Sequence, residues 1–161
     1  MNYNKQFYFL KNLTKKLNNY YKKHSKFGFK VDNKSKTIKE FDPVTNIDRG
    51  FEKYIRLQIH KSFPNDSIIG EEFEDKFSSS DYQWCIDPID GTRAFIIGAP
   101  TWSNLIGLSF QDKSIIGLAN FPELNKHYIS DKKKSFLVKD NQKFILKSSI
   151  NNNLKTIKII G

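Results

Sequence analysis

The stretch that decides the fold is Trp84-Cys85-Ile86-Asp87-Pro88-Ile89-Asp90-Gly91-Thr92, in which an apolar segment leads into two carboxylates and a Gly-Thr pair. Residues 82–86 have the length and composition of a buried strand, so we expect Cys85 to be an inert core thiol. A glycine turn followed by a short helical segment directs backbone N–H groups outward, where they can bind an anion. The sequence therefore predicts a strand–turn–helix unit that carries acidic residues at its turn.

A second acidic turn precedes this unit. Residues 67–69 form a short predicted strand that ends at Gly70-Glu71-Glu72. If the two strands are neighbours, the carboxylates of Glu71, Asp87 and Asp90 converge, and such close like charges need a cation to neutralise them. Mg²⁺ prefers oxygen ligands, and the three scattered histidines offer no zinc cluster. Carboxylate-held metal beside an anion-binding turn predicts metal-assisted hydrolysis of a phosphate ester.

The remaining segments indicate an α+β fold. Apolar residues at helical spacing predict a helix over residues 3–23 and a second helix after Thr45, where Thr45 and Asp48 resemble a capping box. Residues 31–42 are polar and predict a loop. Strand-length segments separated by turn residues follow, at 104–110, 114–120, 126–130, 135–138, 143–147 and 156–160. We expect two helices packed on an antiparallel sheet, within one domain over residues 1–161.

Composition narrows the class of protein. The 161 residues include 14% aromatic side chains, too many for a disordered chain. The net charge is +10, but only three of the 27 basic residues are Arg and seven of the 17 acids lie between residues 71 and 90, so nucleic acid is an unlikely partner. We expect no membrane span and, with one cysteine, a cytoplasmic protein.

Three segments carry a resemblance to a known family. Residues 42–45 (Asp-Pro-Val-Thr) with Asp48, residues 70–72 (Gly-Glu-Glu) and residues 84–92 together resemble the inositol monophosphatase family of Mg²⁺-dependent phosphatases. The stretch from Thr92 to Trp102 is most similar to the histidinol-phosphatase branch. The resemblance implies hydrolysis of histidinol phosphate to histidinol, in histidine biosynthesis. Inositol 1-phosphate and 3′(2′),5′-bisphosphate nucleotides stay open as alternative substrates. It also implies a small phosphorylated metabolite as partner and a homodimer in the full-length form.

The resemblance also implies roles for individual residues. Those that would hold Mg²⁺ are Glu71, Asp87, Asp90 and the backbone carbonyl of Ile89. Glu71 and Thr92 would activate the attacking water, and Asp48 would support Thr92 by a hydrogen bond. The backbone amides that would bind phosphate are those of Gly91 and Thr92. Residues that resemble supporting positions of the family are Glu72, Lys34 and Arg93.

One departure from the family pattern concerns the second half of the fold. Family members are longer, and their second half carries a W-D-x-A-A-G motif whose Asp completes a second metal site; no such motif occurs here. We therefore expect the N-terminal domain of the inositol monophosphatase-like fold, with the C-terminal α/β domain missing and one metal site incomplete. An inactive metal-binding fragment remains an alternative. An uncovered sheet edge and apolar face would favour dimers or aggregation.

Overall fold

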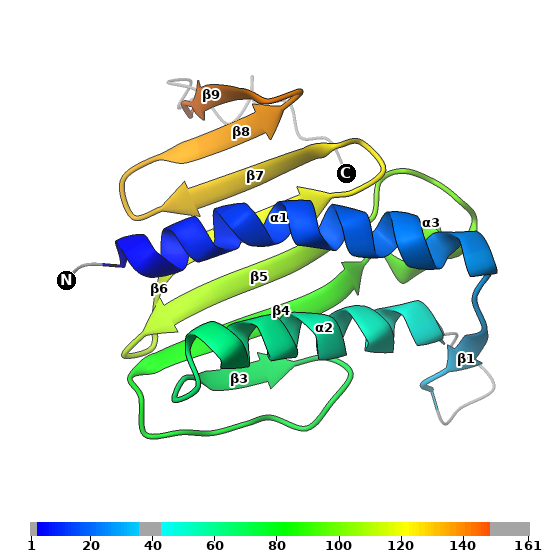
Figure 1. Ribbon diagram of the computed structural model, residues 1–161, viewed down its shortest axis with the longest axis horizontal. Coiled ribbons are helices and arrows are strands. Elements are labelled where there is room, and N and C mark those ends of the chain that lie inside the picture. Colours follow the sequence, from blue (N-terminus) through cyan, green and yellow to red (C-terminus); the bar gives the residue numbers. More distant parts are fainter. Residues whose placement is uncertain (1–2, 36–42, 149–161) are drawn as a thin grey trace, which may run out of the picture.

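The computed structural model describes residues 3–35 and 43–148, in which two long helices pack on a curved sheet (Figure 1). The helices are α1 (Asn4–His24), α2 (Asn46–Ser62) and the short α3 (Thr92–Ile96), with a 3₁₀ turn at Ser25–Phe27. The main sheet has the order β3-β4-β5-β6-β7-β8-β9. Its strands are β3 (Ser67–Gly70), β4 (Tyr82–Asp90), β5 (Ser103–Phe110), β6 (Lys113–Phe121), β7 (Lys126–Asp131), β8 (Ser135–Lys139) and β9 (Gln142–Leu146). β1 (Val31–Asn33) and β2 (Pro43–Thr45) form a separate antiparallel pair.

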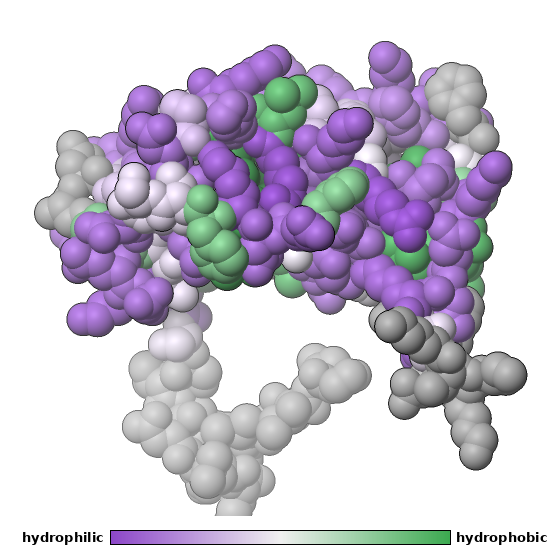
Figure 2. Space-filling view, turned by 90° about the horizontal axis from the view of Figure 1, so that it is seen from below, coloured by the Kyte–Doolittle hydropathy of each residue, from purple (hydrophilic) through white to green (hydrophobic). Residues whose placement is uncertain are grey.

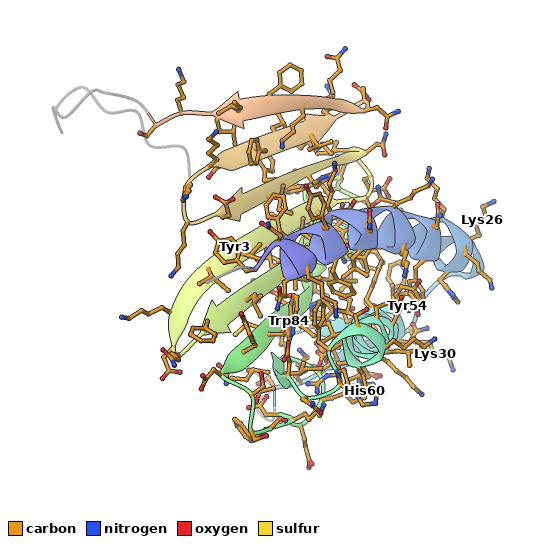
Figure 3. All side chains as sticks on the ribbon, turned by 60° about the vertical axis from the view of Figure 1, so that its left-hand side comes forward. Tyr3, Lys26, Lys30, Tyr54, His60 and Trp84 are labelled. Atoms are coloured by element: carbon orange, nitrogen blue, oxygen red, sulfur yellow. The ribbon has the colours of Figure 1, made fainter. Side chains whose placement is uncertain are left out.

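The two long helices lie side by side on the same face of the sheet (Figure 1). The apolar stripe of α1 buries Leu10, Leu13 and Leu17, and that of α2 buries Phe51 and other residues against the same core. Trp84 lies between the helices and the sheet (Figure 3) and is fully buried. Each helix buries one face because its apolar residues recur every three or four positions. The two predicted helices are thus confirmed.

The start of α2 is fixed by its capping box. The Thr45 side chain accepts hydrogen bonds from the backbone N–H groups of Ile47 and Asp48, and the Asp48 carboxylate accepts one from the Thr45 N–H at 2.9 Å. These bonds satisfy N–H groups that have no partner within the helix. The cap places the Asp48 carboxylate in the protein interior.

The sheet is mixed, which corrects the expectation of a purely antiparallel one. β3 runs parallel to β4, with Ser67 opposite Gln83 and Gly70 opposite Ile86, whereas the other neighbouring strands of this sheet pair antiparallel. A loop over residues 71–81 returns the chain to the starting edge so that β4 can run in the same direction. The carboxyl ends of β3 and β4 therefore meet at one edge of the sheet.

Two further elements differ from the sequence prediction. Residues 31–33, expected in a loop, form β1 because their backbone pairs with residues 43–45. β4 continues to Asp90 rather than ending at Ile86, with a register irregularity against β5 between Asp87 and Asp90. The predicted strand at 156–160 lies outside the described residues.

Cys85 is exposed, which corrects the prediction of a buried thiol. Successive residues of a strand point to opposite faces, so Trp84 faces the helices while Cys85 faces the other side of the sheet. Among the described residues, α1 and α2 cover only the first of these faces (Figure 1).

Seen from below, the surface is largely hydrophilic, with hydrophobic residues in separate places (Figure 2). None of the described helices is long and apolar enough to span a membrane.

Candidate active site

The parallel strand pair brings the predicted acidic residues together. Glu71 directly follows β3, and Asp87 and Asp90 lie in the last residues of β4. The pKa of Asp87 is raised to about 7, first by burial, then by the charge of Glu71 and a hydrogen bond with it, and further by the charges of Asp90 and Asp48. Asp87 Oδ1 is buried without a hydrogen-bond partner. Four carboxylates thus interact at this edge.

The carboxylates are of the chemical type that binds a metal ion, but their side chains are not arranged as a set of metal ligands. Within residues 3–35 and 43–148, no group of three or more His, Cys, Asp and Glu side chains is arranged to hold a metal ion. The carboxylate oxygens and the unpartnered Oδ1 of Asp87 are nevertheless the donors that Mg²⁺ prefers. The chemistry of the donor set therefore fits Mg²⁺.

Lys34 provides a positive charge at this site. Its Nζ lies 2.8 Å from Glu71 Oε1 and 2.5 Å from Glu72 Oε1. The Glu71 side chain is 46% exposed, whereas that of Glu72 is only 3% exposed. Burial lowers the pKa of Lys34, but its hydrogen bonds to the two carboxylates and their charges outweigh this, so the pKa is raised. Burial raises the pKa of Glu72, and the hydrogen bond and charge of Lys34 lower it in part.

Asp48 and Thr92 meet across the interface of α2 and α3. The Thr92 hydroxyl lies 3.3 Å from Asp48 Oδ1 and 3.1 Å from the carbonyl oxygen of Ile89, and it can donate its hydrogen bond to either of them. Asp48 is buried, and burial raises its pKa although its hydrogen bonds with Thr45 and Thr92 lower it. Asp48, the third residue of α2, therefore positions Thr92, the first residue of α3.

Gly91 forms the turn between β4 and α3. Its φ is +84°, in the left-handed region where a side chain is strained, and its carbonyl accepts the N–H of Phe95 at 3.0 Å. This conformation turns the chain from strand to helix directly after Asp90. Arg93 is exposed in the first turn of α3.

A buried ion pair on α2 was not found by sequence reasoning. Glu52 is fully buried; its Oε1 accepts Arg56 Nε at 2.8 Å and its Oε2 accepts the Glu72 backbone N–H at 2.7 Å. Arg56 Nη2 donates to the carbonyl of Phe73 at 3.1 Å. The pair thus fixes the backbone around the Glu71-Glu72 turn. Its sequence signal, Glu and Arg four residues apart on a helix, is common on exposed surfaces.

Asn104, at the start of β5, is a second residue that sequence reasoning missed. It is fully buried, and its Nδ2 donates to the carbonyl of Pro88 at 2.7 Å. Asn120 Nδ2 donates in turn to Asn104 Oδ1 at 3.0 Å. These bonds hold the irregular part of β4 between Asp87 and Asp90. No local sequence pattern marks Asn104, because its partners come from other strands.

Known proteins are similar to this chain in sequence and in fold. A profile of the inositol monophosphatase family matches residues 4–159. A histidinol-phosphatase from Chlorobaculum parvum is 42% identical over 90 residues, covering 56% of this chain and 35% of that protein. An IMPase structure from Thermotoga maritima superposes with a TM-score of 0.68 at 30% identity, covering 82% of this chain and 54% of that one. An IMPase/NADP phosphatase structure complexed with Mg²⁺ and phosphate has a TM-score of 0.70 at 18% identity, covering 80% and 48%.

The matched part is only a portion of each relative: about a third of the Chlorobaculum protein and about half of the solved structures. The family profile, by contrast, spans nearly the whole of this chain. The profile, the sequence identity and the superposition agree on the same assignment. The chain therefore belongs to the inositol monophosphatase family.

Proposed function

We propose that this chain carries the metal- and phosphate-binding part of a Mg²⁺-dependent phosphomonoesterase, with histidinol phosphate as substrate. The observation that carries the proposal is the meeting of Glu71, Asp87 and Asp90 at one sheet edge, beside the left-handed turn at Gly91. The substrate rests on the likeness to a histidinol-phosphatase. The reaction converts the phosphate ester and one water into histidinol and inorganic phosphate.

The carboxylates of Glu71, Asp87 and Asp90, with the carbonyl of Ile89, would hold Mg²⁺. The bound ion would offset the charge of the phosphate group and make a water molecule more acidic. Asp87 is the member of this set whose Oδ1 lacks a partner, and its pKa is raised first by burial and then by neighbouring carboxylates, whose repulsion a cation would relieve. Single acid–base groups contribute only about 10²–10⁴-fold, too little for phosphate ester hydrolysis.

The Thr92 hydroxyl would orient the attacking water. The hydroxyl can donate a hydrogen bond to Asp48 or to the Ile89 carbonyl. Its oxygen then has a lone pair left to accept a hydrogen bond from water. Glu71, the more exposed acid of the Lys34 pair, would accept the proton that the water loses. The N–H groups of Gly91 and Thr92 would bind the phosphate oxygens, with Arg93 as a further exposed cation.

The assay that tests the proposal follows phosphate release by the 161-residue chain with Mg²⁺ or EDTA. We expect Mg²⁺-dependent release from histidinol phosphate, faster than from inositol 1-phosphate. Glu71→Gln should abolish it, because the amide can neither hold the cation as tightly nor accept the proton. The matched control is Glu74→Gln, an exposed acid in the same loop, which should retain activity.

Two other results would revise the proposal. Faster turnover of inositol 1-phosphate or of a 3′(2′),5′-bisphosphate nucleotide would replace histidinol phosphate as substrate. No turnover of any of them, despite metal binding, would support the alternative of an inactive metal-binding fragment. That alternative rests on the share of the relatives that the chain spans.

A further inference from the structure

A polar cavity lies away from the carboxylates, between α1 and the last strands of the sheet. Its volume is about 310 Å³, and its walls include Lys15 and Lys22 of α1, the turn residue Asn125, His127 of β7 and Lys139 of β8. Ligand pockets begin at about this size, so the cavity suits a small molecule or ion. Nothing in the proposed hydrolysis uses these residues.

One residue of the cavity lining, His127, has a buried ring nitrogen without a hydrogen-bond partner among the described protein atoms. Of the buried side-chain atoms without a partner in the described part of the chain, one is Asp87 Oδ1, and the other two are His127 Nε2 and Asn120 Oδ1. His127 lines the cavity directly. Since buried polar atoms nearly always have partners, the unpartnered Nε2 of His127 points to a bound polar group.

The charges of the residues that line the cavity indicate which kind of ligand it binds. Three lysines line the cavity against a single acid, Asp140. The pKa of His127 is lowered, first by burial and then by the nearby charge of Lys11, so the ring is neutral at pH 7 and can donate one N–H. The asparagine amides in the lining, such as Asn18, add further donors. Ammonium, amide and imidazole donors around a small volume match an oxyanion.

We propose that this cavity is a second anion site, which binds a small oxyanion of the phosphate class independently of metal. The inference does not depend on the proposed hydrolysis. Without a divalent cation, the acidic edge formed by Glu71, Asp87 and Asp90 repels phosphate, whereas the lysine-lined cavity attracts it. Binding in the presence of EDTA therefore separates the two sites.

The experiment is a titration of the ¹⁵N-labelled chain with sodium phosphate in EDTA, followed by backbone and histidine-ring NMR signals at ionic strength matched with NaCl. We expect saturable shifts in residues 14–22, 125–127 and 138–141 and in the His127 ring, and none at Glu71 or Thr92. Shifts that grow linearly without saturation, or that occur at the acidic edge instead, would overturn the proposal. So would a response to NaCl alone equal to that with phosphate.

A pair of double variants tests whether the cavity lysines, rather than net charge, are responsible. Lys15→Gln with Lys22→Gln should weaken phosphate binding at least about tenfold, a loss of about 1.4 kcal/mol. Lys53→Gln with Lys61→Gln removes the same charge from exposed positions of α2 and should change the affinity less than about twofold. Equal weakening in both double variants would show general electrostatic attraction and overturn the site. Both lysines of the first variant are exposed, so we expect it to fold.

Discussion

Asp87 is the residue on which pH and metal should act most strongly. Its pKa is raised from 3.8 to about 7 in the folded chain, so between these values the folded state binds more protons than the unfolded state. Stability that Asp87 supports at low pH is therefore lost as pH rises through 7. The pKa is raised first by burial of the charged form and then by repulsion from neighbouring carboxylates, both of which a bound cation would offset.

The corresponding prediction concerns Asp87→Asn, which mimics the protonated carboxyl. In EDTA at pH 8 its melting temperature should exceed that of the parent chain, by about 2–4 °C for each 1 kcal/mol of repulsion removed. At pH 4 the two should melt alike. Mg²⁺ should then raise the melting temperature of the parent at pH 8 but not that of the variant. Asp112→Asn, in an exposed hairpin turn, is the control and should show neither effect; equal melting of Asp87→Asn and parent at pH 8 would refute the assigned repulsion.

The residues of the acidic edge could be predicted from the sequence, but the residues that hold them in place could not. Glu71, Asp87 and Asp90 stand out because each follows or ends a strand pattern, and Glu71 and Asp90 are each next to a glycine. Glu52 gives no such signal, because a Glu and an Arg one helical turn apart usually form an exposed pair. Only the tertiary fold shows that Glu52 is fully buried and bonded to the backbone of Glu72.

At the scale of elements, the direction of one strand determines the site. Had β3 run antiparallel to β4, as in the expected antiparallel sheet, the carboxyl end of β3 would lie at the opposite end of β4 from Asp87. Strand direction depends on the path of residues 71–81, which cross back along the sheet edge and pair at Ile68 and Lys76. The helices, the hairpin turns and the strands 104–146 were predictable because their patterns are local.

The close packing of α2 against the end of β3 leads to a prediction for Gly70→Ala. A Cβ at residue 70 would lie 2.0 Å from Glu52 Oε1, which is buried and held by Arg56. The substitution should cost about 1–3 kcal/mol of unfolding free energy, measured by urea denaturation. Gly107→Ala is the control, since its Cβ would meet Cys85 Cβ at an ordinary 3.8 Å. Equal stabilities of the two variants would contradict the role assigned to Glu52.

At the scale of the whole molecule, the sheet has one face packed against α1 and α2 and another that the described residues leave open. Cys85 marks the open face. We expect its thiol to react in the folded chain with an aromatic disulfide reagent that releases a coloured thiolate. The reaction should be slower than that of free cysteine, because burial and the charge of Asp75 raise the pKa of Cys85.

The control for this labelling is Cys85→Ser, which should release no colour. A thiol that reacts only after urea is added would mean that the face is covered in solution, by a second copy or by residues outside the described ranges. Sedimentation of the same sample at several concentrations would separate these two cases.

The central claim is that the parallel ends of β3 and β4 form a divalent-cation site, and Mn²⁺ binding followed by electron paramagnetic resonance tests it most directly. The parent chain and Glu74→Gln should bind Mn²⁺ alike, whereas Glu71→Gln and Asp87→Asn should each bind at least about tenfold more weakly. Competition by Mg²⁺ should release the bound Mn²⁺. Equal Mn²⁺ affinity in all four proteins would contradict the claim.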